Sequence, residues 1–224
     1  MEFQNTICDD QLKRHISANL ERFQARAHSK EGVHRAAVAL TLVDVAHGSD
    51  DFGLPSYTTR HPDAALILTR RSMRLKNHSG QWALPGGRRD SGEKPADTAL
   101  RELSEEVGLQ LKADRVLGYL DDFTTRSGFV ITPVVVWGGD RVDLVPNPSE
   151  VASIHRIPLA EFLRADAPLI QNSPKGDAPL ILMPVGSTCI AAPTAAMLYQ
   201  FREVALLGKS TRVAHYEQPA FAWK

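Results

Sequence analysis

The central feature of the sequence is a helix pattern between Pro95 and Gly108. Proline is favoured at the first helical position and glycine just past the last one, so both ends of the pattern are marked. The apolar positions of this stretch share one helical face: Ala96, Ala99, Leu100, Leu103 and Val107. We therefore expect an amphipathic helix from about Pro95 to Val107.

Three carboxylates, Glu102, Glu105 and Glu106, lie beside the apolar face of this helix, at positions i, i+3 and i+4. Like charges at this spacing cost a helix about 0.2–0.5 kcal/mol per pair, so the arrangement is unfavourable unless a cation compensates it. Carboxylate oxygens suit Mg²⁺ or Mn²⁺, which bridge a few carboxylates to substrate phosphates. Three glutamates alone are nevertheless more typical of a solvated acidic helix face.

A longer pattern around the helix changes this interpretation. From Gly87 to Leu109 the chain reads GRRDSGEKPADTALRELSEEVGL. This segment resembles the signature of the Nudix hydrolase family: glycine, five residues, glutamate, seven residues, then Arg-Glu-aliphatic-any-Glu-Glu-any-Gly-aliphatic. Every position matches, through Gly87, Glu93, Arg101, Glu102, Leu103, Glu105, Glu106, Gly108 and Leu109.

The resemblance implies an α/β protein with the Nudix fold, an α/β/α sandwich around a mixed β-sheet. It also implies an enzyme that uses water to split a diphosphate linkage in a nucleotide-like small molecule. Mg²⁺ or Mn²⁺ would be held by Glu102, Glu105 and Glu106, and the Gly87 carbonyl would add a ligand.

Supporting and catalytic roles follow from the same resemblance. Glu93 and Arg101 would be structural, with the arginine pairing a carboxylate and orienting the loop against the helix. In some family members the residue that matches Glu102 is the general base, while in others a glutamate outside the signature has that role. Glu105 and Glu150 are the other catalytic candidates; Glu150 follows the turn-forming stretch PNPS and is equally compatible with an exposed loop residue.

The segment before the signature bears on the substrate. Residues 66–87 read LILTRRSMRLKNHSGQWALPGG. They resemble a second signature, which marks the coenzyme A diphosphatase branch: Leu-Leu-Thr-any-Arg-Ser, three residues, Arg, three residues, Gly, three residues, Phe-Pro-Gly-Gly. Lys76 stands where arginine is usual and Leu84 where phenylalanine is usual.

Coenzyme A carries a diphosphate and a ribose 3′-phosphate, and such a substrate needs cations near the metal site. The chain supplies them near the signature with Arg70, Arg71, Arg74, Lys76, Arg88 and Arg89. Arg126, at the tip of an expected hairpin in the stretch TTRSG, is another candidate for substrate binding. Each of these cations is also compatible with a solvated surface position.

We therefore expect hydrolysis of coenzyme A or its derivatives to 3′,5′-ADP and 4′-phosphopantetheine. The main alternative is hydrolysis of another nucleoside diphosphate derivative, such as ADP-ribose or NADH. A Nudix-fold binding module that has lost catalysis is a third reading, but such a module would be expected to lack metal-ligand glutamates, and all of them are present.

Composition agrees with an ordinary globular protein. Lys and Arg together number 26, as do Asp and Glu, so no overall positive field points to nucleic acid or a membrane as a partner. Cys8 and Cys189 lie in no metal or redox spacing, and residues 1–10 contain no apolar run suited to a signal peptide. We expect a cytoplasmic protein and leave a homodimer open.

The remaining pattern predicts the domain organisation. Residues 1–36 would form an N-terminal helical extension, with a helix over roughly 10–28; residues 37–165 would form the Nudix core; and residues 166–224 would form a C-terminal extension whose helix packs on the core. Strands are expected at 36–45, 64–69, 116–123, 129–137 and 151–157, followed by a short helix at 159–164. The stretch 166–184 is rich in proline and polar residues and predicts a long irregular connection, followed by a helix from about Pro193 to Gly208.

Overall fold

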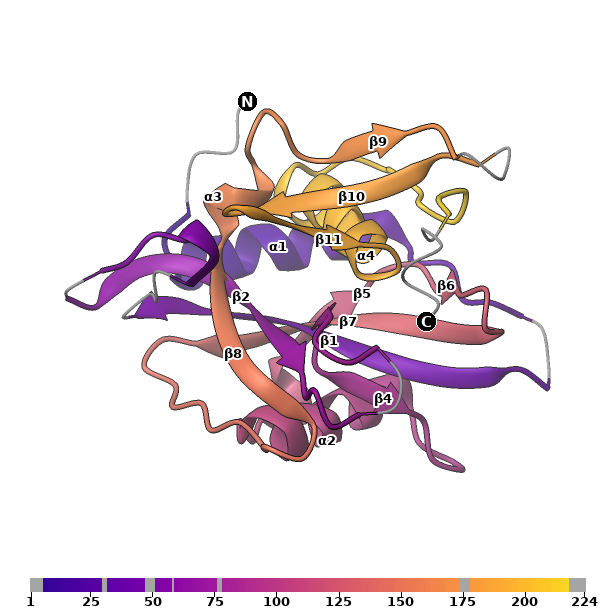
Figure 1. Ribbon diagram of the computed structural model, residues 1–224, viewed down its shortest axis with the longest axis horizontal. Helices are drawn as coiled ribbons and strands as arrows, with labels where there is room; N and C mark the ends of the chain where they lie inside the picture. The colour runs from indigo at the N-terminus through magenta and orange to yellow at the C-terminus, as the bar shows by residue number, and fades with distance from the viewer. Residues whose placement is uncertain are drawn as a thin grey trace.

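The computed structural model describes residues 6–29, 32–46, 51–57, 59–75, 78–173 and 178–217. A central β-sheet carries helix α2 on one face and helices α1 and α4 on the other (Figure 1). The expected mixed sheet with helices on both faces is thus confirmed. The helices are α1 (Asp10–Phe23), α2 (Pro95–Val107), α3 (Leu159–Phe162) and α4 (Thr194–Phe201), the last continued by a π-helical turn, Arg202–Leu206.

Eight strands form the central sheet: β1 (His34–Ala46), β2 (His61–Arg71), β3 (Trp82–Ala83), β4 (Gly86–Arg88), β5 (Val116–Tyr119), β6 (Phe123–Thr124), β7 (Phe129–Gly139) and β8 (Val151–Pro158). Strand β1 runs parallel to β7 and antiparallel to β2, and β8 pairs with the outer side of β2. Because β1 and β2 pair only over part of their length, β3 and β4 fit between their diverging ends, β3 against β2 and β4 against β1.

The alternation of side chains along β2 assigns its residues to two separate cores. Leu66 and Leu68 belong to the larger core, which includes residues of α1 and α4. Ile67 belongs to the smaller core, which is built with the apolar face of α2. The two consecutive arginines that end β2, Arg70 and Arg71, therefore point to opposite faces of the sheet.

The C-terminal part of the chain departs from the sequence expectation. The stretch 166–184 was expected to be irregular, but it contains β9 (Leu169–Gln171) and most of β10 (Leu180–Val185), which form a second sheet with β11 (Thr188–Ala191). The expectation was wrong because buried apolar residues on β10 outweigh the polar composition around them: Ile181 and Met183 lie in the same core as Phe201 of α4.

The ends of two helices also show what the pattern could and could not predict. Helix α2 has the expected bounds, and Gly108 adopts the left-handed conformation at φ 72°. Helix α1 stops at Phe23, earlier than expected, because Gln24 adopts a left-handed conformation at φ 51°. Its buried face, which includes Leu12 and Ile16, ends at the same point.

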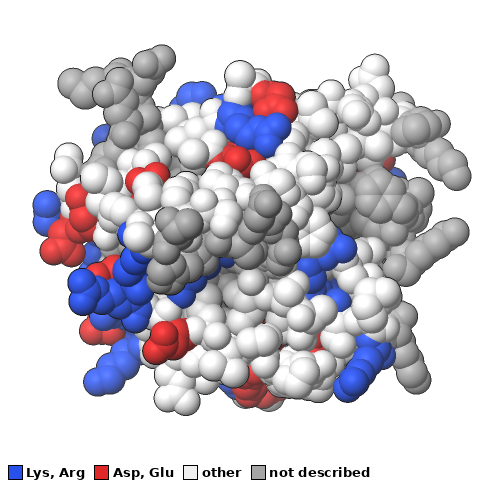
Figure 2. All heavy atoms as spheres, turned by 60° about the vertical axis from the view of Figure 1, so that its left-hand side comes forward, with Lys and Arg blue, Asp and Glu red and all other residues white. Residues whose placement is uncertain are grey.

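Surface charge follows the balanced composition. On the face drawn in Figure 2, basic and acidic side chains lie among each other, and no field of one sign covers it. Among the described residues, no helix combines the length and the apolar character that a membrane crossing requires.

Candidate active site

The position of α2 is set by its apolar face and by both of its ends. Ala99, Leu103 and Val107 pack in the smaller core against residues of β1, β2 and β7. At the first turn, the Asp97 carboxylate accepts a hydrogen bond from the Lys94 backbone N–H at 3.2 Å. At the last turn, the Gly108 N–H donates to the Ser104 carbonyl at 3.1 Å. The helix is therefore held firmly over the sheet, with its second and third turns beside β4.

Three glutamates meet between α2 and the start of β8. Each of Glu102, Glu106 and Glu150 offers a carboxylate oxygen within 4.8 Å of the others. Glu102 and Glu106 are buried, with 9% and 4% of their surface exposed. They are one helical turn apart and face β4, whereas Glu150 comes from a loop that is distant in sequence.

Backbone hydrogen bonds bring Glu150 to the helix. The Val145 N–H donates to the Val107 carbonyl at 3.0 Å, and the Asn147 N–H donates to the Glu106 carbonyl at 2.9 Å. The Glu150 carbonyl in turn accepts a hydrogen bond from the Ser72 N–H at 2.8 Å. The loop before β8 is thus attached to both the end of α2 and the end of β2, which fixes the third carboxylate.

The electrostatics of this cluster favour a cation. Burial, reinforced by the charge of Glu102, raises the pKa of Glu106 to about 8, while Arg71 and the Gly86 backbone N–H act in the opposite direction. Burial also raises the pKa of Glu102. Clustered carboxylates that are costly to ionise are stabilised by a divalent ion, and hard oxygen donors suit Mg²⁺ and Mn²⁺. The residues present therefore fit a site for such an ion.

Gly87 is closely packed against this cluster. A Cβ atom added to Gly87 would lie 2.2 Å from Glu102 Oε1 and 2.5 Å from Glu102 Cδ. Any side chain at this position would displace the carboxylate. The glycine thus leaves room for Glu102 and brings the backbone of β4 next to the glutamates.

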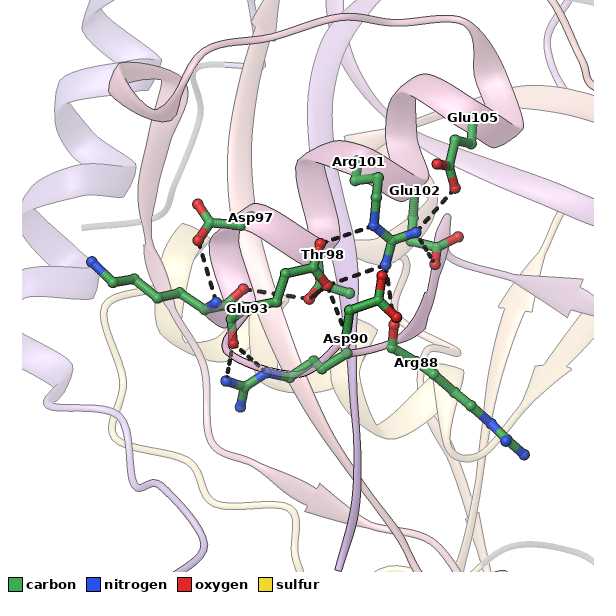
Figure 3. A network of polar contacts seen from close by, with 10 residues as sticks. Arg88, Asp90, Glu93, Asp97, Thr98, Arg101, Glu102 and Glu105 are labelled. Atoms are coloured by element: carbon green, nitrogen blue, oxygen red, sulfur yellow. Dashed lines mark hydrogen bonds and ion pairs between the residues drawn. The ribbon is translucent and has the colours of Figure 1, made fainter.

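Arg101 fastens the loop between β4 and α2 to the helix (Figure 3). Its guanidinium donates to both carboxylate oxygens of Glu93, at 2.9 and 3.2 Å, and to the Arg88 carbonyl at 3.1 Å. It also contacts Glu102 Oε1 at 2.8 Å and Glu105 Oε2 at 3.0 Å. The hydrogen bonds from Arg101 hold the pKa of Glu93 near 2. This pairing positions the loop and orients Glu102.

Comparison with known proteins identifies the family. A protein-family model described as NUDIX domain matches residues 57–176, more than half of the 224-residue chain. The chain belongs to the Nudix family.

Curated relatives carry the Nudix name, and a solved structure has a similar fold. A protein named "Uncharacterized Nudix hydrolase NudL" from Yersinia enterocolitica is 44% identical over 104 residues, which cover 46% of this chain and 53% of the relative. Its namesake from Photorhabdus laumondii is 43% identical over 103 residues, covering 46% and 55%. The match thus spans about half the length of these relatives. A MutT/nudix family protein from Enterococcus faecalis shares the fold, with a TM-score of 0.51, 15% identity, and coverage of 91% of this chain and 75% of that one.

Within this Nudix domain, the glutamates expected to act together are separated by the helix geometry. Successive residues turn by about 100° around a helix, so positions i+3 and i+4 lie on opposite sides of position i. Glu106 turns towards the sheet, whereas the Glu105 side chain is 54% exposed and bonded to Arg101. Among the described residues, the group that could share one ion contains Glu102, Glu106 and Glu150, and Glu105 stands outside it.

The expected substrate-binding cations are also dispersed. Arg71 lies on the face of α2, close enough to lower the pKa of Glu106, and its Nε is buried with no hydrogen-bond acceptor among the described atoms. Arg70 lies on the other face, with its guanidinium 5.3 and 5.1 Å from the ring centres of Phe52 and Trp82. Arg126 pairs with Glu217 at 2.6 Å. Lys76 lies outside the described residues.

Two residues that position the site were not singled out from the sequence. Gly86 donates its backbone N–H to Glu106, and Asn147 links the Glu150 loop to α2. The asparagine sits in the turn-forming stretch PNPS, where its side chain accepts hydrogen bonds from Ser149. Turn composition could have indicated a fixed loop there, but not its partner.

Proposed function

We propose that the chain is a divalent-metal-dependent diphosphatase that hydrolyses coenzyme A or its derivatives to 3′,5′-ADP and 4′-phosphopantetheine. The observation that carries the proposal is the three-glutamate cluster with Arg71 on the same face of the sheet. The cluster fits a divalent ion, and Arg71 belongs to the upstream segment that resembles the coenzyme A signature. The printed name of the curated relatives, Nudix hydrolase, supports the reaction class.

The proposed metal ligands are Glu102 and Glu106 of α2, with Glu150 of the loop before β8, the Gly87 carbonyl of β4 and Glu105 of α2 as further donors. When bound, Mg²⁺ or Mn²⁺ would supply charge stabilisation for the phosphoryl oxygens of the substrate. In the reaction, the oxygen of water forms a bond to one phosphorus, the bridging P–O bond breaks, and the departing phosphate takes its electrons. A proton passes from the water to a carboxylate.

Three carboxylates are candidates for that proton acceptor: Glu102, Glu105 and Glu150. Glu102 is oriented by Arg101, Glu150 by the loop before β8, and Glu105 is the most accessible of the signature glutamates. Arg101 and Glu93 contribute by holding the loop that carries Gly87 and Arg88.

For substrate binding, Arg71 is the cation that the geometry favours. Its charge lies near enough to Glu106 to lower the pKa of that carboxyl, so it is suited to a phosphate oxygen of the diphosphate. Arg70, Lys76 and Arg126 complete the proposed set and are to be tested by the same kind of substitution.

The test is a hydrolysis assay under one Mg²⁺ condition across coenzyme A, acyl derivatives, ADP-ribose, NADH and dinucleoside polyphosphates. We expect the highest kcat/KM for coenzyme A and no turnover after exhaustive chelation. Faster ADP-ribose turnover would assign the alternative substrate class and would mean that Lys76 and Leu84 mark a different specificity. No turnover of any compound would favour the binding module.

Glu105→Gln and Glu106→Gln provide the matched variants for this assay. Each removes a formal charge without changing the volume of the side chain, so the fold is expected to persist. We expect each to abolish most turnover at saturating Mg²⁺. Activity close to wild type in both would remove these residues from the mechanism.

A further inference from the structure

A cavity of about 500 Å³ opens beside the loop that joins β4 to α2. Its walls come from the beginning of β1, the loop itself and the beginning of β7. Arg88 lines it from the end of β4 and Arg89 and Lys94 line it from the loop. His34 lines it from β1 and Phe129 from β7. No residue of the glutamate cluster lines this cavity, so it is a separate feature of the same region.

The cavity has an excess of positive charge. Among the described residues, Arg88, Arg89 and Lys94 form no ion pair with a carboxylate within 4.0 Å. The carboxylate of Glu93, which also lines the cavity, is already bonded to Arg101, so its charge is compensated. The lining also contains Arg35, which lies 3.8 Å from Asp122, and Asp90 is the remaining acid against Arg88, Arg89 and Lys94. The cavity therefore favours an anion.

Two rings form an aromatic wall next to these cations. The ring centres of His34 and Phe129 are 5.3 Å apart and their planes are inclined by 31°. The Arg88 guanidinium lies 5.0 Å from the centre of the Phe129 ring. Planar heterocycles stack on such rings, and an arginine held against an aromatic face keeps its outer N–H groups directed to a ligand.

Strand β4 connects the cavity to the glutamates. Gly86 donates to Glu106, Gly87 touches Glu102, and Arg88 is the next residue. Successive Cα atoms are about 3.8 Å apart, so Arg88 and Arg89 start within about 8 Å of Gly87. The cavity therefore begins one residue along the same strand from the contact of Gly87 with Glu102.

We propose that this cavity binds the phosphorylated nucleoside end of the substrate, with Arg88 and Lys94 facing a phosphate monoester and the His34–Phe129 pair facing the planar base. The identity of the substrate rests on the proposed function. Arg88 is the decisive residue because its side chain points away from the Arg101 network in Figure 3. Only its backbone carbonyl supports the loop.

The test compares coenzyme A with 3′-dephospho-coenzyme A, which lacks the phosphate monoester. Arg88→Gln is expected to lower kcat/KM for coenzyme A by about tenfold or more, mainly through KM, because the contact is equal in ground and transition states. Hydrolysis of 3′-dephospho-coenzyme A should change by less than about twofold. Lys94→Gln should show the same selectivity, and Arg14→Gln, an exposed arginine on α1, serves as the charge-matched control.

Arg89→Gln is a poor test because the Arg89 guanidinium donates to the Glu93 carbonyl and supports the loop. An equal loss on both substrates for Arg88→Gln would show that the residue only steadies the loop, and no loss on either would show that the cavity is not used. Either result overturns the inference while leaving the proposed function intact.

A binding experiment separates this inference from the proposed function. If the wild-type chain does not hydrolyse coenzyme A, calorimetry with adenosine 3′,5′-bisphosphate and adenosine 5′-monophosphate decides. At least tenfold tighter binding of the bisphosphate, lost in Arg88→Gln, supports the cavity as a phosphate monoester site. Equal binding of the two nucleotides overturns it.

Discussion

Replacing Gly87 by alanine should separate activity from stability. The added Cβ would lie 2.2 Å from Glu102 Oε1, and an ordinary contact begins at 3.4 Å, so the carboxylate must retreat by about 1 Å. A misplacement of about 1 Å can cost a factor of 10² in rate, which corresponds to about 2.7 kcal/mol of activation free energy. The backbone carbonyl of residue 87 is kept, so the loss would act through Glu102.

The fold should tolerate this substitution. Gly87 has no positive φ, and the atoms that the new methyl group meets belong to the end of a flexible side chain. Gly86→Ala is the contrasting variant, because its Cβ would lie 2.5 Å from the Ala37 carbonyl oxygen and 2.7 Å from Val38 Cα, which are backbone atoms. We expect it to lower the free energy of unfolding by about 1–3 kcal/mol.

The assay is steady-state hydrolysis at saturating Mg²⁺, combined with thermal melting followed by circular dichroism. We expect Gly87→Ala to lose about 10² in kcat/KM while its melting temperature stays within a few degrees of wild type. Activity within threefold of wild type would refute the argument that Glu102 must hold its position. A large fall in melting temperature would refute the argument that only the side chain moves.

Three further predictions concern single side chains. Glu106→Gln should leave the metal-free melting temperature unchanged or higher, because burial raises the pKa of Glu106 to about 8 and the amide has no ionised form to bury. Mg²⁺ should stabilise wild type but not the variant, and equal stabilisation of both would contradict the metal site. Glu93→Gln should lower the melting temperature most near pH 7. The pKa of Glu93 is about 2 in the folded chain and 4.5 in the unfolded chain, so its carboxylate stabilises the fold above pH 4.5 and loses this contribution as pH falls towards 2. A difference in melting temperature between variant and wild type that is constant from pH 7 to 3 would count against the Arg101 pairing. Arg71→Gln should raise KM for coenzyme A by about tenfold. Arg70→Gln should raise it less, because Arg71 lies near Glu106 whereas Arg70 lies against Trp82 on the other face of the sheet. A larger effect of Arg70→Gln would contradict the assignment of faces.

The sequence alone predicted the features that depend on nearby residues. The apolar repeat and the flanking proline and glycine predicted the bounds of α2, because helix formation and termination are local. The signature placed Glu102 and Glu106 on one turn of that helix, and i, i+4 spacing brings such side chains together whatever the rest of the fold does. The alternating and β-branched runs likewise predicted β1, β2, β7 and β8.

Only the tertiary structure decided which groups meet. Glu105 lies outside the cluster because the packing of α2 on the sheet directs Glu106 towards the sheet. Glu150 lies within the cluster because backbone hydrogen bonds attach its loop to α2 and β2. Consecutive strand residues point to opposite faces, so Arg70 and Arg71 are separated in any fold of this strand. The packing of β2 against α2 decides which of the two lies near the glutamates. The sheet of β9, β10 and β11 was missed because its short strands are stabilised by pairing and by burial against α4, neither of which is recorded in a local pattern.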